Sequence, residues 1–147
     1  MKHILIILSI LLFSFTIISC SKSSDDGTKS TDHSTTTSTG LFVTVGQSGT
    51  ILTSPDGTTW TERSLETIRI RNLKGITYGN GTFVTVGLGG TILTSSDNGT
   101  SWDKRTSGTS KYLHGGVTYG NGLFVTVGDS GTILTSLDGT TWTERTS

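Results

Sequence analysis

Hydrophobic and polar residues alternate in short runs from Leu41 to the end of the chain, and the runs repeat. The run Phe-Val-Thr-Val-Gly occupies residues 42–46, 83–87 and 124–128, so the repeat is 41 residues long in both steps. Alternation of this kind places Phe and Thr on one face of a β-strand and the two Val residues on the other. A period near forty residues is typical of solenoids, propellers and other repeat arrays.

Each repeat contains four segments with strand character. Strand one is Gly-Ile-Thr-Tyr at 75–78 and Gly-Val-Thr-Tyr at 116–119, and the Gly-Asn-Gly turn that follows is a strong hairpin signal. Strand two is the Phe-Val-Thr-Val run, strand three is Thr-Ile-Leu-Thr, and strand four begins at each tryptophan. Four-stranded antiparallel units of this length are typical of β-propeller blades. Residues 41–64 lack strand one, so we expect an all-β fold with eleven strands, an incomplete propeller of about three repeats.

A turn rich in Asp and Gly separates strands three and four in every repeat. Its Asp side chain accepts hydrogen bonds from nearby backbone N–H groups, and its Gly adopts the positive φ that a tight turn needs. The Trp beyond the turn is a large apolar side chain that favours burial. The residues concerned are Ser54, Asp56, Gly57 and Trp60 in the first repeat, Ser95, Asp97, Gly99 and Trp102 in the second, and Ser136, Asp138, Gly139 and Trp142 in the third.

These turns resemble the Asp-box repeat of bacterial sialidases, and the whole unit is similar to repeats of the photosystem II assembly-factor type. The resemblance covers residues 41–147 and implies a propeller-type fold. Sialidases use three arginines, a Tyr/Glu nucleophile pair and an Asp acid/base, but here Arg63, Arg105 and Arg145 occupy one repeated strand position. We therefore expect cross-strand surface pairs at these arginines and a protein that is not an enzyme.

The composition excludes several kinds of site. The formal net charge is zero, so there is no electrostatic case for nucleic-acid binding. The one cysteine rules out an intramolecular disulfide and a cysteine-based zinc site. Each Asp-containing turn brings one carboxylate, whereas a calcium loop needs several oxygen ligands, and His114 is the only histidine of the repeat region. We expect no metal and no cofactor.

The N-terminal segment has the pattern of an export signal. Lys2 precedes an apolar run from residue 4 to residue 18, which is shorter than a membrane span. The end of the run, Ile17-Ile18-Ser19-Cys20, resembles the lipobox of bacterial lipoproteins, although common lipoboxes carry Leu at the position of Ile17 and Ala or Gly at that of Ser19. The resemblance implies cleavage after residue 19 and lipidation of Cys20. An ordinary cleaved signal and an uncleaved anchor are the alternatives.

A polar segment follows the cysteine. Residues 21–40 contain twelve Ser or Thr residues and no aliphatic or aromatic side chain. Such a segment cannot bury enough apolar surface to fold, which predicts a disordered tether. We therefore expect a signal peptide at 1–19, the lipidated Cys20 and tether at 20–40, and a repeat domain at 41–147. The expected location is the outer membrane or the cell surface of a bacterium.

A binding site would lie where the repeats differ from one another. The longest such segments connect strand four of one repeat to strand one of the next, and loops on a rigid scaffold commonly carry recognition. Drift after duplication, without function, is the alternative. The candidate residues are Arg69, Arg71 and Lys74 in the first connector and Lys111, Tyr112 and His114 in the second.

We expect a surface-anchored, non-enzymatic module that binds a protein or glycan partner and is held on the membrane by its lipid. A sialidase-like glycosidase fragment and a truncated paralogue without activity are the alternatives. The repeat count raises a separate question, because propellers close with about four to eight blades. Completion of the ring by a homo-oligomer, truncation of a longer gene and an open three-blade wedge all remain open.

Replacing Cys20 with Ser is expected to abolish lipid labelling and membrane retention, because the lipid is attached at this residue in lipoproteins. Metabolic labelling with a fatty acid and fractionation of the membrane measure the two effects. Ser19→Ala, which is closer to the common lipobox, is the control and should keep both. Unchanged retention of the Cys20→Ser protein would reject the lipobox.

Overall fold

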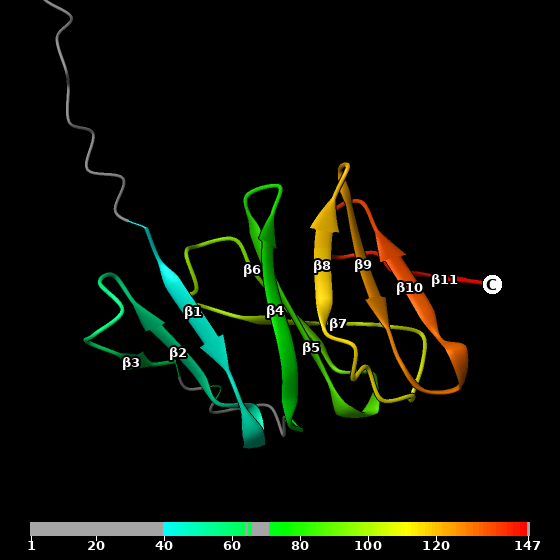
Figure 1. Cartoon of the computed structure of the whole chain (residues 1–147), viewed down its shortest axis with the longest axis horizontal. Coiled ribbons are helices and arrows are strands. Elements are labelled where there is room, and N and C mark those ends of the chain that lie inside the picture. The colour runs from blue at the N-terminus through cyan, green and yellow to red at the C-terminus, as the bar shows by residue number, and fades with distance from the viewer. Residues whose placement is uncertain (1–39, 64, 66–70, 147) are drawn as a thin grey trace, which may run out of the picture. The chain divides into compact units, whose positions relative to one another are not determined.

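The described part of the chain is built from three antiparallel β-sheets (Figure 1). The computed structural model describes residues 40–63, 65 and 71–146. The expected signal peptide, Cys20 and nearly all of the tether lie outside the described residues, as does Arg69. The three sheets all belong to the expected repeat domain.

Each sheet is one repeat, and its strands are paired in chain order. Blade 1 contains β1 (Phe42–Val45), β2 (Ile51–Ser54) and β3 (Thr61–Glu62). Blade 2 contains β4 (Leu73–Gly79), β5 (Thr82–Gly87), β6 (Ile92–Ser95) and β7 (Asp103–Arg105). Blade 3 contains β8 (Val117–Gly120), β9 (Leu123–Val127), β10 (Ile133–Ser136) and β11 (Thr143–Arg145). The predicted all-β fold, an incomplete propeller with antiparallel blades, is confirmed, and blade 1 has no strand before β1 in the described residues.

Both faces of each blade are apolar, as the alternation in the Phe-Val-Thr-Val run predicts. Phe83 packs in a cluster with blade 1, whereas its neighbour Val84 packs in a second cluster with blade 3. Paired residues of neighbouring strands lie on the same face of the sheet. Phe83 lies opposite Ser95, and Val84 lies opposite Thr94. A blade in the middle of the row is therefore buried on two sides.

The side chains at equivalent positions of the three repeats define two kinds of face. We call the Phe, Leu and Trp set the leading face of a blade, and the Val, Val and Ile set its trailing face. The leading faces are Phe42, Leu52 and Trp60 in blade 1, Phe83, Leu93 and Trp102 in blade 2, and Phe124, Leu134 and Trp142 in blade 3. The trailing faces are Val43, Val45 and Ile51, then Val84, Val86 and Ile92, then Val125, Val127 and Ile133.

The two hydrophobic cores are formed where these faces meet. The leading face of blade 2 packs on the trailing face of blade 1, with Leu73 and Ile76 added from β4. The leading face of blade 3 packs on the trailing face of blade 2, with Leu113, Val117 and Tyr119 added. The same packing of a leading face on the trailing face of the preceding blade thus occurs at both interfaces between blades.

Glycines allow the innermost strands of blades 2 and 3 to approach closely. The strands β4 and β8 are in contact, and a Cβ at Gly75 would lie 2.8 Å from the Cα of Gly116. A Cβ at Gly79 would overlap the ring of Tyr119, which packs against Phe124. The repeat-equivalent Gly120 in blade 3 has nothing within 4 Å of its Cβ position.

We expect Gly79→Ala to lower the free energy of unfolding by about 1–3 kcal/mol, because the new methyl group overlaps the ring of Tyr119 and forces it out of the blade interface. Gly120→Ala is the matched control and should change stability by less than about 0.5 kcal/mol. Urea denaturation followed by tryptophan fluorescence measures both. Equal stability of the two variants would contradict the packing of β8 on β4.

Candidate binding face

Short 3₁₀ turns connect the second and third strands of every repeat. They are η1 (Gln47–Gly49), η2 (Leu88–Gly90) and η3 (Asp129–Gly131). Each has a central residue with positive φ, which is Ser48, Gly89 or Ser130. The described residues of the connectors, 71–72 before β4 and 106–116 between β7 and β8, lie at this same end of the blades. We call this end, with the turns and connectors, the connector face.

Asn72, at the end of the first connector, is held against two turns by hydrogen bonds from their backbone N–H groups. The side-chain oxygen of Asn72 accepts from the N–H of Ser48 in η1 at 3.0 Å. The backbone carbonyl of Asn72 accepts from the N–H of Leu88 in η2, also at 3.0 Å. Arg71 lies over η2, since a Cβ at Gly89 would be 3.2 Å from Cδ of Arg71. The first connector is thus tied to blades 1 and 2 together.

The second connector bridges blades 2 and 3 in the same manner. The carbonyl of Lys111 accepts from Gly90 of η2 at 2.7 Å, and the carbonyl of Tyr112 accepts from Asp129 of η3 at 2.9 Å. Leu113, between the exposed Tyr112 and His114, is fully buried and donates to Gly87. Anchoring by the buried Leu113 fixes where its exposed neighbours point.

His114 and Asp129 are hydrogen-bonded to each other on the connector face. Nε2 of His114 lies 2.6 Å from Oδ1 of Asp129, and both side chains are partly exposed. The ring of Tyr112 meets the imidazole edge-on, with centroids 5.7 Å apart. Asp129 replaces Gln47 and Leu88 of the other repeats, so this cluster exists only in blade 3. The sequence analysis identified His114 as a candidate, but its hydrogen bond to Asp129, fifteen positions along the chain, is visible only in the fold.

A groove of about 520 Å³ lies beside η2, lined by Gly89, Gly90 and residues 104–110. Its wall is closely packed, because a Cβ at Gly90 would overlap the carbonyl oxygen of Thr109. Lys104 in this lining corresponds to Glu62 and Glu144 in the other blades, so blade 2 reverses the charge there. The repeat pattern did not mark Lys104 as a binding candidate, although this reversal of charge is visible in the sequence. Arg105 also lines the groove, and its guanidinium is bonded to the Asp103 carboxylate.

The remaining predicted candidate, Lys74, is separate from this cluster. It lies in β4 at the irregularity between Leu73 and Gly75, and its side chain is exposed. The structure thus brings Lys111, Tyr112 and His114 together on the second connector and places Arg71 on the first.

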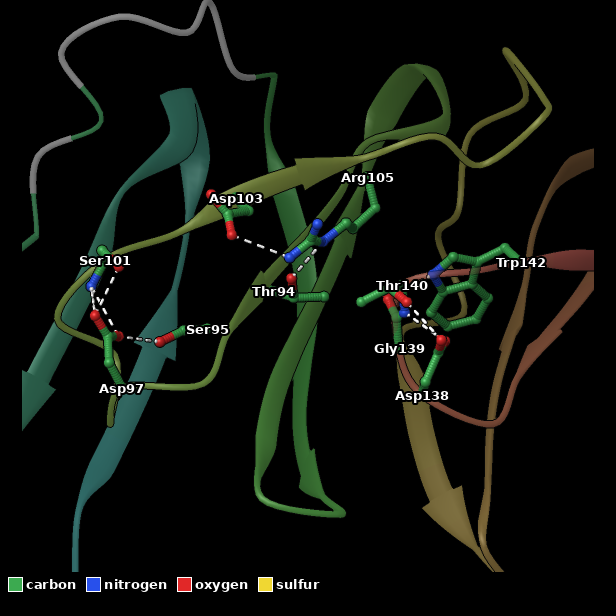
Figure 2. A network of polar contacts seen from close by, with 10 residues as sticks. All are labelled: Thr94, Ser95, Asp97, Ser101, Asp103, Arg105, Asp138, Gly139, Thr140 and Trp142. Carbon is green, nitrogen blue, oxygen red and sulfur yellow. Dashed lines mark hydrogen bonds and ion pairs between the residues drawn. The ribbon is translucent and has the colours of Figure 1, made fainter.

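The three repeated arginines are held inside their own blades. Nε of Arg63, Arg105 and Arg145 donates to the hydroxyl of Thr53, Thr94 and Thr135 at 2.9, 2.8 and 2.8 Å, respectively. Figure 2 shows Arg105 between Thr94 and Asp103, with its second bond of 3.0 Å to the Asp103 carboxylate. These are cross-strand pairs, each in a separate blade, and they do not converge on one point.

The Asp-containing turns lie at the opposite end of the blades, because each third strand runs from its 3₁₀ turn to the Asp turn. Figure 2 shows the carboxylates of Asp97 and Asp138 folded back on their own turns. Asp138 accepts from the N–H groups of Thr140 and Thr141 at 2.8 and 2.9 Å, and Asp56 accepts from Thr58 and Thr59 in the same way.

The turn also positions the glycine and the tryptophan. The hydroxyl oxygens of Ser54, Ser95 and Ser136 accept from the N–H of Gly57, Gly99 and Gly139, whose φ angles are 75°, 75° and 77°. The indole N–H groups of Trp102 and Trp142 donate to the carbonyls of Gly99 and Gly139 at 3.1 and 2.9 Å. These bonds fold the indole beneath the turn, toward the preceding blade.

Hydrogen bonding lowers the pKa of all three turn carboxylates. The hydroxyl and backbone N–H of Ser101, then the hydroxyl of Ser95, lower the pKa of Asp97 from 3.8 to about 2. The pKa of Asp56 is lowered mainly by the N–H groups of Thr59 and Thr58, and that of Asp138 mainly by the hydroxyl of Thr140. The turns hold their carboxylates as anions, bonded to their own backbone.

Metal-ligating side chains do not cluster in the described ranges, where no group of three or more His, Cys, Asp or Glu residues is placed to hold a metal ion. The same part of the chain contains no helix that is long and apolar enough to cross a membrane.

Comparison with known proteins supports the fold. No protein-family description matches this sequence, and no curated protein matches it either. Among solved structures, the chain is similar to one described as YCF48 bound to D1 peptide, with 24% identity and a TM-score of 0.55. The similarity covers 69% of this chain and 34% of the other, so the chain spans about a third of that protein's length. YCF48 is a propeller, and the likeness shows that fold for this chain.

We expect acid to destabilise the domain through the Asp turns. A carboxylate whose pKa is lowered by folding contributes stability that is complete above its unfolded pKa and is lost as the pH falls through its folded pKa. For Asp97 the loss should therefore run from about pH 4 to about pH 2. Replacing Asp56, Asp97 and Asp138 with Asn should lower stability at pH 7 and flatten this dependence.

Denaturation midpoints measured between pH 2 and pH 7 test the expectation. Glu144→Gln is the control, because Glu144 is an exposed carboxylate on β11, outside the turns. It should leave the pH dependence unchanged. A triple variant with the same acid sensitivity as the parent protein would show that other groups cause the loss.

Proposed function

We propose that this protein is an exported, lipid-anchored and non-enzymatic module that binds a segment of a partner protein through its connector face. One observation carries the proposal. The side chains that differ between the repeats gather on the connector face, where backbone hydrogen bonds to the 3₁₀ turns hold them in place.

The rigidity of the connector face favours recognition. Side chains presented from a fixed backbone lose little conformational entropy on binding, so more of the contact energy appears as affinity. Asn72, Lys111 and Tyr112 each use a main-chain or side-chain oxygen to fix a turn.

The charges indicate an acidic segment as the partner. Arg71 and Lys111 are exposed on the connectors, and Lys104 lines the groove beside η2. The one acidic side chain of the second connector's cluster, Asp129, is already paired with His114. Carboxylates of a partner would meet these cations, and Tyr112 adds exposed apolar surface beside them.

The solved structure with a similar fold supports a peptide as the class of ligand. That protein, YCF48, is described as bound to D1 peptide. A propeller of this type can therefore bind a protein segment, and we extend that class of ligand to the present chain. Binding of a glycan at the same face is the alternative, and a glycan array separates the two.

The anchor and the lack of catalysis complete the proposal. The sequence from Ile17 to Cys20 supports lipidation, and the Ser/Thr-rich segment after it would hold the domain away from the lipid surface. The arginines that would bind a sialoside carboxylate are instead bonded to threonines of three separate blades, which supports a binding role over a glycosidase.

A photo-crosslinking amino acid in place of Tyr112 should capture a partner protein in intact cells, because that side chain lies at the centre of the proposed surface. The same amino acid in place of Ser96 is the control, since Ser96 is exposed in the Asp turn at the opposite end of blade 2. Glu occupies the position of Lys104 in blades 1 and 3. Lys104→Glu, combined with the photo-crosslinking amino acid at position 112, should reduce the yield of crosslinked product severalfold.

Immunoblotting and mass spectrometry of the crosslinked bands measure the outcome. No adduct at position 112, equal adducts at positions 112 and 96, or a yield that Lys104→Glu does not change would contradict the proposal. Turnover of a sialoside that is lost in Arg105→Ala would instead favour the glycosidase hypothesis.

A further inference from the structure

Within residues 40–63, 65 and 71–146, the two outer faces of the row of blades lack the cover that their equivalents have. Phe42 of blade 1 is 54% exposed, whereas the equivalent Phe83 and Phe124 are 9% and 0% exposed. Trp60 is 42% exposed, whereas Trp102 is 6% exposed. At the other end, Val127 of blade 3 is 44% exposed and its equivalent Val86 is fully buried. Blade 1 therefore presents an uncovered leading face, and blade 3 an uncovered trailing face.

These two uncovered faces are complementary in the same way as the faces that pack together in the two cores. Each interior interface joins Phe, Leu and Trp of one blade to Val, Val and Ile of the blade before it. Residues of the same types are left at the ends, with Phe42, Leu52 and Trp60 on one side and Val125, Val127 and Ile133 on the other. A contact between them would continue the interface that the chain already makes twice.

The glycines of the Asp turns show how such a contact would pack. A Cβ at Gly99 would lie 3.1 Å from Thr53 and 3.8 Å from Val43, both in the preceding blade. A Cβ at Gly139 would likewise lie 3.0 Å from Val84 and 3.7 Å from Thr94. At Gly57 the neighbours within 4 Å all belong to Phe42 of the same blade. The turn of blade 1 thus has the same shape but no blade beneath it in the described residues.

A cavity marks the corresponding place on blade 3. It measures about 200 Å³ and is lined by residues that include Leu123, Thr135 and Arg145. Thr135 is the repeat equivalent of Thr53 and Thr94, the threonines that the glycines of the next blade approach. The cavity is therefore the position that the Asp turn of a following blade would occupy.

We propose that two copies of this chain associate head to tail, the leading face of blade 1 in one copy packing on the trailing face of blade 3 in the other. Because the two surfaces differ, the contact is heterologous, and such contacts either close into a ring or extend into a filament. Propellers close with about four to eight blades. Two copies of the described repeats bring six blades and two such contacts, so the expected product is a closed dimer.

Complementation between variants tests this pairing. The full chain, extracted in a mild detergent, should have the mass of a dimer in sedimentation equilibrium after the detergent is accounted for. Trp60→Asp removes the leading surface and Val127→Asp the trailing surface, so each variant alone should be a monomer. A mixture of the two should form a heterodimer, because each variant keeps the face that the other has lost.

Controls separate this proposal from the partner-binding function. Tyr112→Ala changes an exposed aromatic residue of the connector face and should remain a dimer. Circular dichroism verifies that each variant is folded, and Phe42→Ser replaces Trp60→Asp if the latter does not fold. A monomeric parent chain, a mixture that stays monomeric, or an open assembly larger than the dimer would overturn the proposal. So would a different polypeptide bound at the Trp60 face.

Discussion

Packing of the Phe, Leu and Trp side chains of one blade on the Val, Val and Ile side chains of the preceding blade is the interaction that the rest of the structure depends on. A sheet with two apolar faces cannot be stable alone, because both faces would remain in water. Stacking covers them in pairs, as in other repeat proteins, where each unit contacts only its neighbours. Blade 2 is the best buried of the three, since it has a neighbour on each side.

The Asp turn makes this stacking specific. Its carboxylate and serine hydroxyl satisfy backbone N–H groups, which leaves the glycine close to the preceding blade and directs the tryptophan into the interface. The carboxylate and the serine hydroxyl form these hydrogen bonds within their own turn. The motif therefore stabilises the structure of the blade. The connectors, which vary in residue type between the repeats, lie at the other end of the blades.

The structure also explains why duplication can produce a new surface without loss of the fold. Residues that face a neighbouring blade are constrained by packing, so Phe83 and Phe124 occur at the same position with nearly the same burial. Asp129 lies in η3 and Lys104 in β7, and neither belongs to a core cluster. Asp129 can therefore replace Gln47 and Leu88, and Lys104 can replace a glutamate, without disturbing either core.

The sequence by itself determined the strands, the turns and the sidedness of each blade, because alternation with a period of two and a repeat of 41 residues are local signals. It also located the connectors as the variable segments. The tertiary structure alone decided which side chains meet, such as His114 with Asp129 and Gly79 with Tyr119, since these contacts join positions far apart in the chain. It likewise decided that Trp60 is exposed while Trp102 is buried, because burial depends on whether another blade covers the same residue type.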